Sequence, residues 1–82
     1  ISLPRRPVVS GFEVIKVLQK LGFSFLRQAG SHVQLRKVVD DKRLRVTVPL
    51  HDELAIATLN TIVTDVAEFE GMTKEEVYDL LR

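Results

Sequence analysis

The length of 82 residues predicts a single domain over residues 1–82, and the composition, 45% hydrophobic and 28% charged, is typical of a soluble globular protein. The chain has no cysteine, which excludes a disulfide framework and thiolate-bound metals. No apolar run approaches the roughly 18 residues that a membrane-spanning helix needs, and no signal peptide is apparent at the start of the sequence. We therefore expect a cytoplasmic protein without a membrane partner.

The formal net charge of +1 hides an uneven distribution along the chain. Residues 1–51 carry ten Lys and Arg against three acids, and residues 52–82 carry two against eight, so the two parts have charges of +7 and −6. A strongly basic part indicates a surface that binds an anion such as nucleic acid. Chance segregation of charge on a small surface is the alternative interpretation at this point.

The first expected elements are an extended arm and a helix. Residues 1–8 form the arm, because Pro4 and Pro7 have no backbone N–H for regular hydrogen bonding. Ser10 and Glu13 have the spacing of a capping box, which predicts a helix over residues 11–21. Gly22 is expected to end this helix.

Three strands are expected next, over residues 23–29, 32–38 and 43–48, with turns at Gly30-Ser31 and Asp40-Asp41. A second helix should begin near Thr58 as N-cap and end at about Phe69, before Gly71. A second capping box at residues 73–76 predicts a short C-terminal helix. This order predicts an α+β fold in which a three-stranded antiparallel sheet has its helices on one face.

The second hairpin can be placed in register from its turn. If Asp40 and Asp41 form the turn, Arg36 lies opposite Arg45 and His32 lies opposite Pro49, and alternate residues share a face. One face is then apolar apart from a lysine at its rim, so the helices must cover it. The other face presents to solvent His32, Gln34, Arg36, Arg43 and Arg45.

This open face has the chemistry of an anion-binding surface. Arginine side chains match phosphate oxygens in a bidentate way, and the paired stretch contains no acid. An exposed antiparallel face is polar in any case, but it would ordinarily mix both signs of charge. His32 adds an imidazole, the kind of side chain that can serve in the proton transfer that cleavage of an RNA phosphodiester requires. A surface histidine without a catalytic role is the alternative.

At these residues the sequence resembles the HicA toxins, also called YcfA-like proteins, of toxin–antitoxin modules. The Gly30-Ser31-His32 turn combined with Val48-Pro49 and His51 is the most specific part of the resemblance. The other matching segments are Leu3-Pro4, Ser10-Gly11, residues 13–15, residues 18–23, residues 27–29, Val46-Thr47, Thr58-Leu59 with Ile62, Glu75-Glu76 and Leu80-Leu81. The sequence departs from the family at Ala57, where glycine is frequent, and at Phe12, where a basic residue is common.

The resemblance implies a fold like the double-stranded-RNA-binding domain and an endoribonuclease that cleaves mRNA without a metal or another cofactor. It also implies a HicB-like antitoxin as partner. The catalytic histidine of the family maps onto His32. Together with the open face, this predicts a set of RNA-binding residues: Arg27, Ser31, Gln34, Arg36, Arg43 and Arg45.

Several alternatives remain open from the sequence. A non-catalytic RNA-binding module of the same fold and a protein-interaction domain are the two rival functions. His51 is expected to order the loop after the third strand. The alternatives are a second proton-transfer role and a metal site with Asp52 and Glu53. The register of the first strand is also open, because a two-residue turn at Gly30-Ser31 places Phe25 beside the arginines and a one-residue slip buries it.

Overall fold

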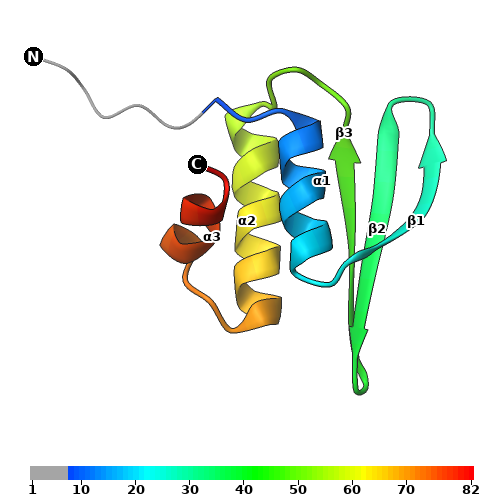
Figure 1. Cartoon of the computed structure of the whole chain (residues 1–82), viewed down its shortest axis with the longest axis vertical. Helices are drawn as coiled ribbons and strands as arrows, with labels where there is room; N and C mark the ends of the chain where they lie inside the picture. Colours follow the sequence, from blue (N-terminus) through cyan, green and yellow to red (C-terminus); the bar gives the residue numbers. More distant parts are fainter. Residues whose placement is uncertain (1–7) are drawn as a thin grey trace, which may run out of the picture.

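The computed structural model describes residues 8–82, so the arm expected at residues 1–8 lies outside the described residues except for Val8. The elements follow in the predicted order (Figure 1). They are α1 (Gly11–Lys20), β1 (Ser24–Ala29), β2 (His32–Val39), β3 (Lys42–Pro49), α2 (Ile56–Glu70) and α3 (Lys74–Leu80). No helix within residues 8–82 is long and apolar enough to cross a membrane.

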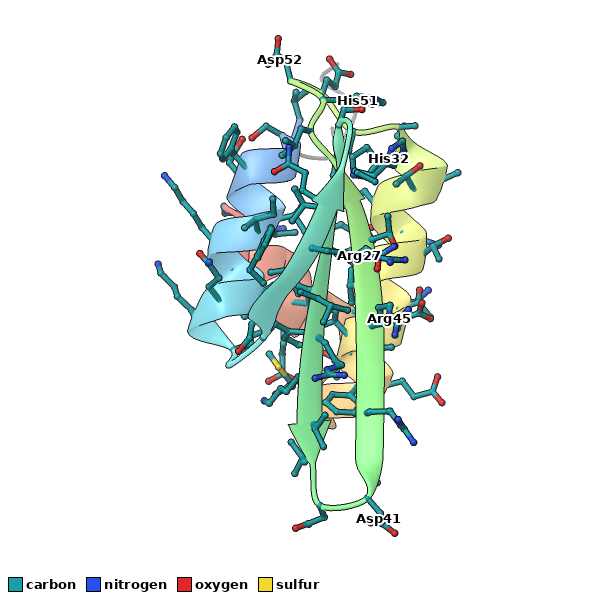
Figure 2. All side chains as sticks on the ribbon, turned by 90° about the vertical axis from the view of Figure 1, so that its right-hand side faces the viewer. Arg27, His32, Asp41, Arg45, His51 and Asp52 are labelled. Carbon is teal, nitrogen blue, oxygen red and sulfur yellow. The ribbon has the colours of Figure 1, made fainter. Side chains whose placement is uncertain are left out.

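The three strands form one antiparallel sheet with β2 in the centre, between β1 and β3. Helices α1 and α2 both lie on one face of this sheet, and α3 packs against α2 on the side away from the sheet (Figure 1). The other face of the sheet is not covered by any described element (Figure 2). The expected α+β fold, similar to a double-stranded-RNA-binding domain, is confirmed.

The ends of α1 follow the sequence signals. The Ser10 side chain accepts a hydrogen bond from the Glu13 backbone N–H, and the Glu13 carboxylate accepts one from the Ser10 N–H, which completes the capping box. At the other end Gly22 has a φ of 96°, and the N–H groups of Gly22 and Phe23 donate to the carbonyls of Gln19 and Leu18. A glycine supplies this left-handed conformation without steric cost.

Helix α2 begins at Ile56, so the prediction of Thr58 as its N-cap is wrong. The N-cap is Ala55, which makes no side-chain hydrogen bond. Leu54 just before it is buried, and its N–H donates to the carbonyl of Val9 at 2.8 Å. This tertiary anchor places the N-cap three residues upstream of Thr58, and tertiary contacts of this kind override local propensity.

The end of α2 and the start of α3 lie where the sequence predicts them. Gly71 has a φ of 68° and ends α2. Thr73 and Glu76 form the capping box of α3. The hydrogen bonds from the Thr73 backbone and side chain hold the pKa of the exposed Glu76 carboxyl below its ordinary value.

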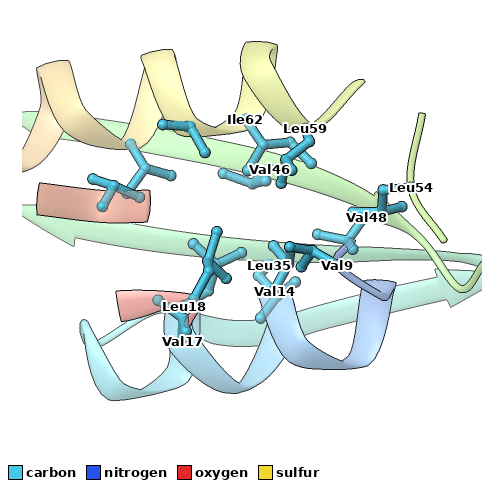
Figure 3. Close-up of a cluster of buried hydrophobic side chains, with 14 of the residues drawn as sticks. Val9, Val14, Val17, Leu18, Leu35, Val46, Val48, Leu54, Leu59 and Ile62 are labelled. Atoms are coloured by element: carbon cyan, nitrogen blue, oxygen red, sulfur yellow. The ribbon is translucent and has the colours of Figure 1, made fainter. Parts of the chain in front are cut away.

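The core lies between the inner face of the sheet and the two long helices (Figure 3). Alternate residues of β2 and β3 point into it, so the predicted apolar face is confirmed. Its central members are Val33, Leu35, Val46 and Val48 of the sheet, Val14 and Leu18 of α1, and Leu59, Ile62, Val63 and Val66 of α2.

Lys37 is the rim lysine of this apolar face, and it joins three elements. Its Nζ donates to the carbonyl of Leu21 at 2.6 Å and to the Glu70 carboxylate at 2.8 Å. It also lies 5.9 Å from the centre of the Phe23 ring. The cation thus sits at the C-terminal end of α1, where the helix dipole favours positive charge, and ties this end to β2 and to the end of α2.

A β-bulge in β1 decides the register that the sequence leaves open. Ala29 pairs with His32 and Arg27 pairs with Gln34, as a two-residue turn requires, but the register shifts between Phe25 and Arg27. Phe25 therefore lies opposite Leu35 and not beside the arginines. It nevertheless stays 58% exposed, because β1 is the strand farthest from the helices (Figure 1). Neither of the two expected placements of Phe25 is correct.

Candidate active site and nucleic-acid interface

The open face of the sheet arranges its side chains in rows across the strands. The hairpin turns set these rows, because Asp40 at a φ of 55° allows the two-residue Asp40-Asp41 turn and Gly30 at 58° allows the Gly30-Ser31 turn. The predicted register of β2 and β3 is confirmed. Counted from the Gly30-Ser31 end, the rows are Ala29, His32 and Pro49; Arg27, Gln34 and Thr47; Ser24, Arg36 and Arg45; and Val38 with Arg43.

His32 is the first residue of the central strand, and its side chain is exposed. Its neighbours in the row, Ala29 and Pro49, carry no ionisable group. The backbone beside it is fixed, since the Leu50 N–H donates to the carbonyl of Ser31 at 2.7 Å. Within residues 8–82, no hydrogen bond or ion pair engages the His32 imidazole. Both ring nitrogens are therefore available to a ligand.

The three arginines expected beside His32 lie on the same open face and are all exposed. Arg36 and Arg45 are directly opposite each other, and like charges in this arrangement destabilise a sheet. The ion pairs among the described residues are Lys37–Glu70 and Arg82–Asp79, so no acid there neutralises the arginines. Two adjacent arginines that repel each other and have no acidic ion-pair partner are typical of a surface that binds an anionic ligand.

The basic side chains of the open face form a long strip and not a compact patch. Figure 2 shows His32 near one end, Arg27 and Arg45 in the middle, and the Asp41 turn at the other end. Arg27 and Gln34 are in contact, with Arg27 Nε donating to Gln34 Oε1 at 3.1 Å. Ser31 lies in the turn and is exposed beside His32. All seven predicted site residues thus lie on this face or at its turn.

The family model of the HicA toxins of bacterial toxin–antitoxin systems matches residues 11–67, which is more than half of the chain. This protein belongs to the HicA toxin family. The match extends from the first residue of α1 into the last turns of α2, and it contains all seven predicted site residues. No curated protein and no solved structure matches the chain. Membership of the HicA family implies a role as a toxin and a cognate antitoxin as partner.

His51 of this HicA toxin lies at the same end of the sheet as His32 (Figure 2). Its carbonyl accepts a hydrogen bond from the Gly11 N–H at 2.9 Å, which joins the loop after β3 to the start of α1. Its side chain is exposed, as are Asp52 and Glu53. Within the described residues, no group of three His, Asp or Glu is arranged to hold a metal ion. The backbone of His51 has a structural role, in agreement with the expected ordering of this loop.

Sequence reasoning missed the role of Gly11 beside the candidate site. It is buried, and a Cβ atom at this position would collide with the carbonyl oxygen of Pro49. Pro49 is the residue that pairs with His32. The close approach of α1 to the end of β3 therefore supports the backbone opposite the candidate catalytic residue. The Ser10-Gly11 segment was the only sequence signal, and it indicates a helix start without indicating this contact.

Proposed function

We propose that the chain is a cytoplasmic endoribonuclease, folded as one domain, that cleaves mRNA through His32 without a metal and is inhibited by a HicB-like antitoxin. The observation that carries this proposal is the position of His32. It is an exposed histidine without a hydrogen-bond or ion-pair partner among residues 8–82, and it lies on the same open face as Arg36, Arg43 and Arg45, within the range matched by the HicA family. The proposed RNA-binding residues are these arginines with Arg27, Ser31 and Gln34.

The proposed reaction needs only proton transfer and charge stabilisation. The ribose 2′-oxygen loses its proton and forms a bond to phosphorus, while the bond from phosphorus to the 5′-oxygen breaks and that oxygen gains a proton. Neutral imidazole accepts the first proton, and imidazolium donates the second. Arginine N–H groups stabilise the additional negative charge on the phosphoryl oxygens. The substrate must therefore be RNA, because DNA lacks the 2′-hydroxyl.

The two rival functions have less support. A non-catalytic double-stranded-RNA-binding module would be expected to grip phosphates with basic residues near a helix N-terminus, and residues 55–61 at the start of α2 contain no Lys or Arg. A pure protein-interaction domain gives no reason for placing Arg36 opposite Arg45. A cleavage assay on RNA and on its 2′-deoxy counterpart, in the presence of a chelator, separates the proposed enzyme from both rivals. Cleavage of RNA alone supports the proposal, and no cleavage of either contradicts it.

RNA binding should weaken steeply as salt is added, because bound arginines release counterions from the phosphates. We expect the Arg36→Ala, Arg45→Ala double variant to reduce the slope of log Kd against log salt by about 1.4, given a slope of roughly 0.7 per phosphate contact for single strands. The measurement is fluorescence anisotropy on a His32→Ala background, which prevents cleavage.

The matched control for this measurement is the Lys16→Ala, Lys20→Ala double variant. It removes the same charge from exposed positions of α1, away from the open face. Its slope should stay close to that of the parent protein. Equal slopes for the two double variants would mean that net charge, and not this face, determines RNA binding.

The antitoxin should inhibit by covering the open face. We expect a stoichiometric complex in which RNA cleavage is lost and acylation of His32 by diethyl pyrocarbonate is strongly slowed, because a buried imidazole is inaccessible to the reagent. Mass spectrometry resolves modification of His32 from that of His51, which are the two histidines of the chain. A complex in which His32 reacts as fast as in the free protein and cleavage continues would contradict this mode of inhibition.

A further inference from the structure

Arg27 and Gln34 form a side-chain pair across the β1–β2 hairpin, in the row next to His32. Gln34 lies two residues from His32 on the same strand and face, which places its Cα roughly 6.6 Å farther along the sheet at 3.3 Å per residue. Arg27 is exposed and Gln34 is half-buried. The distance between the pair and the candidate catalytic group is therefore about the length of one nucleotide. The pair lies between the row of His32 and the row of Arg36 and Arg45.

The hydrogen bond between them determines what the pair offers to a ligand. Arg27 uses its Nε–H to donate to Gln34 Oε1 at 3.1 Å. Since the arginine has only donors, the amide must face it with its oxygen, and the amide N–H groups are left to point elsewhere. The two terminal nitrogens of the guanidinium retain their four N–H groups. The pair thus presents donors and hardly any acceptor capacity.

The same hydrogen bond fixes the orientation of the guanidinium plane. An exposed arginine samples many rotamers, and ordering such a side chain on binding costs roughly 0.5–1.5 kcal/mol in free energy. A guanidinium that is already held through Nε keeps its terminal fork free for a bidentate contact. Gln34 is held in turn by the central strand, with β1 on one side and β3 on the other.

We infer that Gln34 is a positioning residue for Arg27, and that the pair is a subsite for two adjacent hydrogen-bond acceptors on the nucleotide next to the cleaved linkage. This inference rests on the proposed ribonuclease function. Two sources of such acceptors exist in RNA. They are the oxygens of the neighbouring phosphate, and the O6 and N7 atoms of a guanine base. Adenine fits less well, because a donor flanks its N7.

The first test separates an oriented pair from a simple positive charge. Arg27→Lys keeps the charge but loses the fork, and Gln34→Leu removes the acceptor that holds it. We expect each variant to raise KM on the order of tenfold to a hundredfold with kcat nearly unchanged, which is the range for hydrogen bonds to charged groups. The double variant should lose little more than either single one, because the two residues act as a unit.

Thr47→Val is the matched control, since Thr47 is exposed, occupies the same row on the other side of Gln34, and is not bonded to it. It should leave both kinetic constants close to those of the unmodified protein. Circular dichroism and melting temperature verify that each variant is folded. Wild-type kinetics for Arg27→Lys, or additive losses for Arg27→Lys and Gln34→Leu, would overturn the inference while the proposed function stands.

The second test identifies the acceptors with modified oligonucleotides. One carries 7-deazaguanine in place of the guanine beside the cleaved linkage, and another carries a methylphosphonate at the neighbouring phosphate. We expect one of these substrates to raise KM for the wild-type protein and to have no further effect on Gln34→Leu. If neither substrate changes KM, the subsite does not exist. A wild-type protein that cleaves no RNA at all, while His32→Ala and wild type bind it equally, would instead overturn the proposed function.

Discussion

The His32→Ala protein should fold normally and cleave RNA at least roughly a hundredfold more slowly than wild type, because a positioned proton-transfer group typically contributes that much to the rate. His32 is exposed at the start of β2 and makes no side-chain hydrogen bond within residues 8–82. Its removal therefore leaves no core cavity, and the free energy of unfolding should change by about 0.5 kcal/mol or less. The measurements are single-turnover cleavage, growth arrest on expression, and thermal unfolding.

RNA binding by His32→Ala should persist, since Arg36, Arg43 and Arg45 remain. His51→Ala is the matched control at the same end of the sheet, with a smaller expected loss of activity because its described contact is made by its backbone. A folded His32→Ala protein that cleaves at the wild-type rate would refute the assignment and favour the non-catalytic RNA-binding module. If alanine disturbs folding, His32→Gln provides the same comparison with a polar side chain of similar size.

The second large effect is expected from Gly11→Ala. At an open helical position this substitution stabilises a protein, because alanine has the higher helix propensity. At Gly11 the added Cβ would collide with the carbonyl oxygen of Pro49 and lie 3.1 Å from the Leu50 Cα, and these backbone atoms cannot rotate away. We expect a loss of about 2 kcal/mol in the free energy of unfolding, as for an overpacked core, and a melting temperature lower by roughly 8–16 °C.

Gly71→Ala provides the comparison for this prediction. Gly71 has a φ of 68°, but a Cβ there would meet no atom within 4 Å, so only backbone strain should matter. Its cost should be about 1 kcal/mol. Gly11→Ala should also lower activity beyond its effect on stability, because Pro49 pairs with His32. A Gly11→Ala protein at least as stable as wild type would show that the helix and the strand end can separate without cost.

The register of the β2–β3 hairpin could be predicted from the sequence because two constraints agree. The Asp40-Asp41 turn specifies one pairing of the two strands. The same pairing places the alternate apolar residues Val33, Leu35, Val46 and Val48 on one face, where they are buried. A one-residue error would move these four side chains from the core to solvent. In that register, His32, Arg36 and Arg45 lie on the face opposite the four apolar side chains, which is the face left open to solvent.

The register of β1 could not be predicted in the same way. Five of its six residues are exposed, so alternation of apolar and polar residues does not constrain it. The bulge near Leu26 and the contact between Arg27 and Gln34 therefore required three-dimensional information. The start of α2 escaped prediction for a related reason, since it depends on the backbone contact of Leu54 with Val9, far away in the sequence.

The position of His32 on the central strand has a consequence for how this toxin must be controlled. Strand β2 is hydrogen-bonded on both sides, and its alternate residues, Val33 and Leu35, are buried in the core. Its backbone amides should be among the slowest to exchange with solvent, so the candidate site is permanently assembled and needs no closing motion. For the proposed function, this means that the antitoxin would inhibit by occupying the open face, and its dissociation rate would set how long RNA cleavage is suppressed.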